Sequence, residues 1–132
     1  MADNNSRSLK SFFFSCGGFF GGYNEMNIES NGISSVLCVT PSRLTGKADI
    51  KKELSADEWK AFSDKIMSTF HLFDWKDEYV NHDILDGTQW SIKVNYIDET
   101  QKEVYGSNDY PDNWDDFIQF INEFVSFSEI RF

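Results

Sequence analysis

The feature that most constrains the fold is a strict alternation of apolar and polar side chains around residue 90. Trp90, Ile92, Val94 and Tyr96 are apolar, and a polar residue separates each from the next. A period of two is that of a β-strand with one face buried and the other in water. We therefore expect a sheet whose apolar face meets the helices of the domain.

Further strands are predicted before this one, in a meander over the first forty residues. Residues 9–15 are rich in phenylalanine, and residues 23–29 alternate between apolar and polar side chains. Between them, residues 17–22 hold two glycine pairs around Phe19 and Phe20, which indicates a wide hairpin connection or a bulge. Asn31-Gly32 is a strong signal for a tight hairpin into a strand over residues 33–40.

Two helices are also predicted. Ser55 and Glu58 have the spacing of a capping box, so a helix begins there and runs to about Thr69. A second helix opens after Pro111, with Asp112 or Asn113 as its N-cap. The apolar stripes of the two helices are formed by Trp59, Phe62, Ile66, Met67 and Phe70, and by Trp114, Phe117, Ile118, Ile121, Phe124 and Val125.

These elements predict a single α+β domain over residues 9–132, with residues 1–8 frayed. The expected order is ββ(β)αββα: an antiparallel sheet of about five strands with two amphipathic helices packed on one face. The last two strands are residues 89–96 and a short partner over residues 102–106. The remaining segments are interpreted as connections: a basic one over residues 43–52, and a loop over residues 70–86 with a short turn of helix or strand.

The net charge of −10 is concentrated in the middle of the chain. Residues 74–116 contain twelve acids and three bases, whereas the segments on either side are nearly neutral. Such a surface repels phosphates and anionic lipids, so we expect neither nucleic-acid nor membrane binding. The acidic segment is either a solubilising face or a patch for a basic partner, and residues 74–86 hold five acids against Lys76 alone.

Patterns for catalysis or metal binding are weak. His71 and His82 are too far apart to share one helix face, and the acids from Asp109 to Asp116 lack the spacing of a calcium loop. We predict no catalytic residue, no metal site and no cofactor. Cys16 and Cys38 have no CxxC or Cys/His spacing, so we expect buried thiols, with a bridge between neighbouring strands as the alternative.

The chain carries no recognisable targeting segment. Arg7 and Lys10 precede Ser11–Cys16, which loosely suggests a lipoprotein signal, but only three phenylalanines form its apolar part. A signal peptide needs about 7 to 15 apolar residues and a membrane helix about 20. We therefore expect a cytoplasmic protein, although a chain whose signal had been removed would look the same.

Three segments together resemble a family of small bacterial α+β domains. They are the glycine-rich residues 17–23, the sequence DGTQWSI at residues 86–92, and GSNDYPDNW at residues 106–114. The resemblance spans residues 12–118 and implies an intact bacterial domain. Because that family has no established activity, the resemblance assigns no catalytic residue to this chain.

We favour a noncatalytic, acidic protein-binding domain, such as an inhibitor or immunity-type partner of a basic protein surface. Trp75, Tyr79 and Tyr110 are expected to be exposed within this charged segment, and such aromatic side chains are typical of binding hot spots. The alternative is a small-ligand-binding or enzymatic domain that uses residues 17–22 and 106–111 as pocket walls, with Phe19, Phe20, His82 and Asn108 lining the pocket. The chain is expected to be a monomer or a weak homodimer through Phe120, Phe127 and Phe132. The candidate binding residues are Asp74, Trp75, Asp77, Glu78, Tyr79, Asp83, Asp86 and Tyr110.

Overall fold

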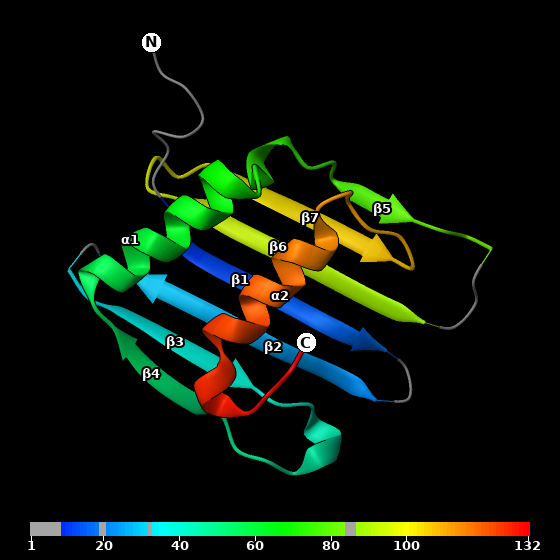
Figure 1. Ribbon diagram of the computed structural model, residues 1–132, viewed down its shortest axis with the longest axis horizontal. Helices are drawn as coiled ribbons and strands as arrows, with labels where there is room; N and C mark the ends of the chain where they lie inside the picture. Colours follow the sequence, from blue (N-terminus) through cyan, green and yellow to red (C-terminus); the bar gives the residue numbers. More distant parts are fainter. Residues whose placement is uncertain (1–8, 19–20, 32, 84–86) are drawn as a thin grey trace.

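The structure is a computed structural model, which describes residues 9–18, 21–31, 33–83 and 87–132. Within these residues, seven strands form one sheet in the order β4-β3-β2-β1-β6-β7-β5, and two α-helices cover one face (Figure 1). The elements are β1 (Leu9–Gly18), β2 (Gly22–Ser30), β3 (Ser35–Thr40), β4 (Ile50–Leu54), α1 (Ala56–Asp64), β5 (Glu78–Val80), β6 (Thr88–Tyr96), β7 (Gln101–Ser107) and α2 (Trp114–Phe124). The predicted α+β class is confirmed, including the two helices on one face.

The alternation of β6 sets the two faces of the sheet. Trp90, Ile92, Val94 and Tyr96 are all buried beneath the helices, and β1 pairs with β6 in antiparallel register, with Phe12 opposite Val94. Alternate residues of β1, β2, β3, β6 and β7 therefore contribute to the same core. The other face of the sheet carries no helix in the described part of the chain, and we call it the open face (Figure 1).

The first helix begins as its sequence predicts. The Ser55 hydroxyl accepts from the Glu58 amide at 3.1 Å, and the Glu58 carboxylate accepts from the Ser55 amide at 3.0 Å. This reciprocal pair satisfies two amides that the first turn would otherwise leave without partners. The helix then widens into a π-helical turn over Lys65–Thr69, so its end near Thr69 is also as expected.

The second helix begins at Trp114, with Asn113 at the N-cap position. The Asn113 side chain makes no capping hydrogen bond, and its Nδ2 donates to the Phe70 carbonyl at 2.9 Å. This bond joins the start of α2 to the end of the π-helical turn. The buried face of α2 places Phe117 against Phe14 and Phe70, with ring centroids 5.4 and 5.6 Å apart.

Two strands are absent from the prediction, which expected about five strands. Residues 43–52 were interpreted as a basic connection, but Ile50–Leu54 forms the edge strand β4 beside β3. Its central residues Lys51, Lys52 and Glu53 are exposed. Charged side chains of this kind protect a sheet edge from pairing with other chains, and they also hide the strand from an apolar pattern.

The second missing strand is β5, which lies within the predicted loop over residues 70–86. It has three residues and pairs in parallel with β7, so that Glu78 lies beside Tyr105. The sheet is therefore antiparallel except at this edge. A three-residue strand is too short for periodicity to distinguish it from a loop.

Candidate functional site

The three segments that carry the family resemblance meet at one end of the sheet. In the register, Gly18 of β1 lies opposite Thr88, and Trp90 of β6 lies opposite Gly106 of β7. A Cβ atom on Gly106 would lie 2.0 Å from the Cε2 and Nε1 atoms of Trp90. Residue 106 must therefore be glycine to let the indole lie across the backbone.

Asn108 closes the loop that follows β7. Its backbone has a φ of 58°, and its side-chain oxygen accepts from the Thr88 amide at 2.9 Å. Asparagine tolerates this left-handed conformation better than most residues. Gly106 and Asn108 thus have structural roles at the positions that the alternative hypothesis assigns to a pocket wall. Phe19 and Phe20, the other expected wall residues, lie outside the described residues.

An aromatic cluster surrounds Trp90 on the helix side of the sheet. Trp90 is buried, and its Nε1 donates to the Asp109 carbonyl at 3.0 Å. Its ring centroid lies 4.4 Å from that of Trp114, 5.9 Å from Tyr79 and 6.5 Å from Tyr110. Tyr110 stays 38 % exposed at the surface of this cluster.

Trp75 was predicted to be an exposed binding residue, and this is wrong. Its side chain is only 6 % exposed, and its Nε1 donates to the Phe70 carbonyl at 3.0 Å. Its ring packs edge-on against Phe117 and Trp90. Acidic neighbours in the sequence made this tryptophan look exposed, but it is an anchor that fixes the chain between α1 and β5 to the core.

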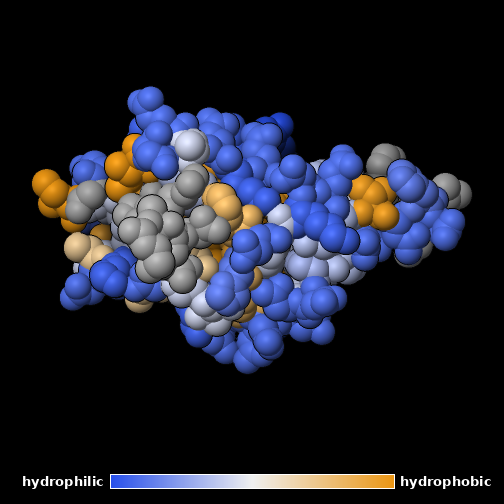
Figure 2. Space-filling model, turned by 90° about the horizontal axis from the view of Figure 1, so that it is seen from above, coloured by the Kyte–Doolittle hydropathy of each residue, from blue (hydrophilic) through white to orange (hydrophobic). Residues whose placement is uncertain are grey.

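The predicted acidic residues lie along the β5 side of the sheet. Asp74 ends a short 3₁₀ turn, Asp77 and Glu78 lead into β5, and Asp83 follows it, and all four are exposed. We call Asp74, Asp77, Glu78 and Asp83 the acidic edge. Asp86 lies outside the described residues. Figure 2 shows that hydrophilic residues cover most of the molecule in the view from above.

Only one carboxylate of the acidic edge has a cationic partner among the described residues. Asp77 accepts from the Lys102 ammonium at 3.2 Å, and that ammonium also donates to the Trp75 carbonyl. Asp74, Glu78 and Asp83 form no ion pair within the described ranges. Three neighbouring negative charges are thus left for an external cation or for water.

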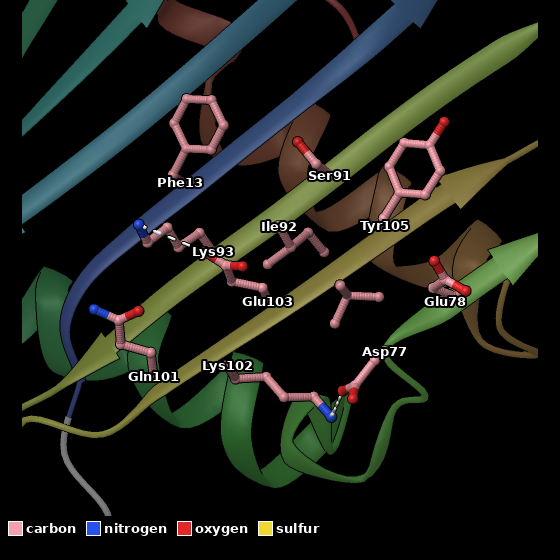
Figure 3. A pocket seen from close by; sticks show the side chains of 11 residues that line it. Phe13, Asp77, Glu78, Ser91, Ile92, Lys93, Gln101, Lys102, Glu103 and Tyr105 are labelled. Atoms are coloured by element: carbon pink, nitrogen blue, oxygen red, sulfur yellow. Dashed lines mark hydrogen bonds and ion pairs between the residues drawn. The ribbon is translucent and has the colours of Figure 1, made fainter.

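A concavity of about 710 Å³ opens on the open face beside the acidic edge. In Figure 3, Phe13, Ser91, Lys93, Glu103 and Tyr105 line it, and Asp77 and Glu78 lie at its β5 side. The Lys93 ammonium pairs with the Glu103 carboxylate across it at 3.5 Å. Asp77 and Glu78 therefore join the predicted segment to a surface that the sequence interpretation did not include.

The residues that were missed are Phe13, Glu103 and Tyr105. Phe13 comes from β1, whereas Glu103 and Tyr105 come from β7, so no local motif unites all three. The signal in the sequence was the alternation of apolar and polar positions. Each of the three residues lies next to at least one buried residue of its strand, so its side chain points to the other face of the sheet. Mapping the polar half of each strand onto a common face would have found them.

A second concavity, of about 490 Å³, lies between α1 and α2. It is lined by Phe62, Phe120 and Phe124, with charged residues at its rim. Phe120, which was expected to be available for dimer formation, packs 5.5 Å from both Phe62 and Phe70. Phe132 likewise packs on Phe14, whereas Phe127 is 40 % exposed with the Lys52 ammonium 5.0 Å from its ring centroid.

The two cysteines point to opposite sides of the sheet, and both are free thiols. Cys16 lies opposite Trp90 on the helix side, whereas Cys38 lies opposite Asn27 on the open face. The alternative of a bridge between them is therefore wrong. Burial raises the pKa of the Cys16 thiol to about 11, so it stays protonated at neutral pH.

Within the described ranges, no three His, Cys, Asp or Glu side chains come together as a metal site would require. No described helix is long and apolar enough to cross a membrane. Comparisons of the chain with family models, with curated proteins and with solved structures gave no significant match.

Proposed function

We propose that this chain is a noncatalytic protein-binding domain that recognises a basic surface of another protein through its acidic edge. The observation that carries the proposal is the set of exposed carboxylates Asp74, Glu78 and Asp83, which form no ion pair among the described residues. Opposite charges placed against them by a partner would gain Coulomb energy and raise the association rate.

The surroundings of the acidic edge support the same function. Tyr110 is partly exposed at the surface of a rigid aromatic cluster, so ordering it on binding costs little conformational entropy. β5 is an edge strand of the sheet, so a partner can approach its carboxylates without displacing another strand. In this proposal the protein is an inhibitor or immunity-type protein that acts in the cytoplasm of a bacterium.

The test is affinity capture from the native host with the wild-type chain and with an edge variant, Asp74→Asn, Asp77→Asn, Glu78→Gln and Asp83→Asn. A matched control neutralises four exposed acids of the two helices, Asp57, Asp64, Asp116 and Glu123. The product of the neighbouring gene is the first partner to examine by name, because toxin and immunity proteins are encoded together.

We expect the edge variant to lose its partner and the control variant to keep it. Each exposed carboxylate that contacts a cation should contribute roughly a two- to fivefold change in affinity. Capture of the same proteins by the wild type and by the edge variant would refute the proposal. Equal loss from both variants would also refute it, because only the net charge would then matter.

A further inference from the structure

Two rows of side chains cross the centre of the open face. The cross-strand register places Glu25, Ser15, Ser91, Tyr105 and Glu78 in one row, from β2 through β1, β6 and β7 to β5. The neighbouring row is Asn27, Phe13, Lys93 and Glu103. Adjacent strands lie about 4.8 Å apart, so the side chains of each row are neighbours on the open face.

The shape of the concavity follows from the sizes of these side chains. Ser15 and Ser91 are small, and the ring of Tyr105 lies directly opposite Ser91 on β7, while that of Phe13 lies diagonally from Ser91 on β1. Figure 3 shows both rings facing the same open space, with Lys93 and Glu103 between Phe13 and β5. Ser91 thus forms a low floor of the concavity between two aromatic walls.

The charge of the open face is also uneven. Its register positions carry the carboxylates of Glu25, Glu29, Glu53, Glu78 and Glu103, and the ammonium groups of Lys51 and Lys93. Lys93 is engaged by Glu103, while Glu25 and Glu78, at the two ends of the serine row, form no ion pair within the described part of the chain. A cation above the serines would have a carboxylate on each side.

We propose that this concavity binds an arginine side chain of the basic partner. The aliphatic part of the arginine lies over Ser91, its guanidinium stacks on Tyr105 beside Phe13, and its N–H groups donate to Glu78. A guanidinium is planar, so it can stack on an aromatic ring while it forms parallel hydrogen bonds with a carboxylate, which an ammonium group cannot do. This inference rests on the proposed function and adds the open face to the acidic edge as a contact surface.

The probe is a capped tri-arginine peptide, added to the ¹⁵N-labelled full chain at low ionic strength, where surface charges are least screened. Capped tri-lysine and tri-glutamate peptides are the comparison probes. Two open-face variants carry Tyr105→Leu and Glu78→Gln singly, a two-residue edge variant carries Asp74→Asn and Asp83→Asn, and Glu123→Gln on α2 is the control. All these positions are at least partly exposed, and the amide spectrum of each variant reports whether it is folded.

We expect tri-arginine to shift the amide signals of Ser91, Lys93 and Tyr105 most strongly. The Tyr105→Leu and Glu78→Gln substitutions should each weaken its binding roughly two- to fivefold, and the control should not. If the amide signals of Asp83 and its neighbours alone shifted, and these shifts were lost only in the two-residue edge variant, this inference would be overturned and the proposed function would stand. Equal binding of tri-lysine would overturn the assignment to arginine, and no binding of either cationic peptide would overturn both proposals.

Discussion

Replacing Gly106 by alanine tests how tightly the candidate site is built. The new Cβ atom would lie 2.0 Å from two atoms of the Trp90 ring and 2.5 Å from a third, whereas ordinary contact begins at 3.4 Å. The indole would therefore have to recede by about 1.4 Å. Trp114 and Trp75 pack against the same ring, so there is no space for it to move without displacing them.

The cost has two parts. Overpacking a well-packed core costs about 1–3 kcal/mol, and a displaced indole that loses its bond to the Asp109 carbonyl leaves a buried donor unsatisfied, at about 1–3 kcal/mol more. We expect Gly106→Ala to lower the free energy of unfolding by about 2–5 kcal/mol. For a chain of this size, the melting temperature should fall by roughly 10 °C or more.

The assay is urea unfolding followed by tryptophan fluorescence, with Gly21→Ala as the matched control. A Cβ on Gly21 meets nothing within 4 Å, so that substitution should change stability by less than about 0.5 kcal/mol. In a Trp90→Phe background, which removes the ring atoms that collide, Gly106→Ala should cost much less. A loss below about 0.5 kcal/mol for Gly106→Ala, or the same loss in both backgrounds, would refute the reasoning.

Four further experiments have expected outcomes. Ser55→Ala should destabilise the chain by about 0.5–2 kcal/mol in thermal unfolding, because α1 loses its N-cap. The Ser55 amide holds the pKa of Glu58 below its usual value. The stability that this bond contributes is present above the unfolded-state pKa and is lost as pH falls through the folded-state pKa. Glu58→Gln should therefore reduce the loss of stability at acidic pH, and an unchanged dependence of stability on pH would contradict this. Alkylation at pH 8 followed by mass spectrometry should label Cys38 much faster than Cys16, whose burial raises its pKa to about 11, and equal rates would be inconsistent with the structure. Lys102→Met should speed hydrogen exchange of the Tyr105 amide, which donates to the Asp77 carbonyl, because Lys102 holds that segment through Trp75 and Asp77; unchanged exchange would show that β5 is held in place without it.

The fold class could be predicted because long elements carry strong periodic signals. The alternation in β6 and the capping box at Ser55 both predicted what the structure contains. β4 and β5 could not be found in this way. β4 has charged residues at its centre because it is an edge strand, and β5 is shorter than two periods of the apolar and polar alternation.

The candidate site was only partly predictable, for a different physical reason. Composition located the acidic segment, but charge density in the sequence does not say which side chains share a surface. Glu78 and Tyr79 are adjacent in the chain, yet Glu78 lines the concavity of the open face while Tyr79 packs on Trp90 from the helix side. Trp75 was misplaced for the same reason, since its burial depends on contacts with Phe117 that are distant in the sequence.

The polar half of each strand pattern therefore contains more functional information than its apolar half. The apolar residues of β1, β2, β6 and β7 converge on one core, and their identities are constrained by packing. The residues between them face water on the open face, where solubility alone would be satisfied by scattered polar side chains. Instead, this face places two aromatic rings beside small serines and ends the row with a carboxylate on each side. Packing of the core does not require that arrangement, which is why the open face, together with the acidic edge, is where binding should be sought.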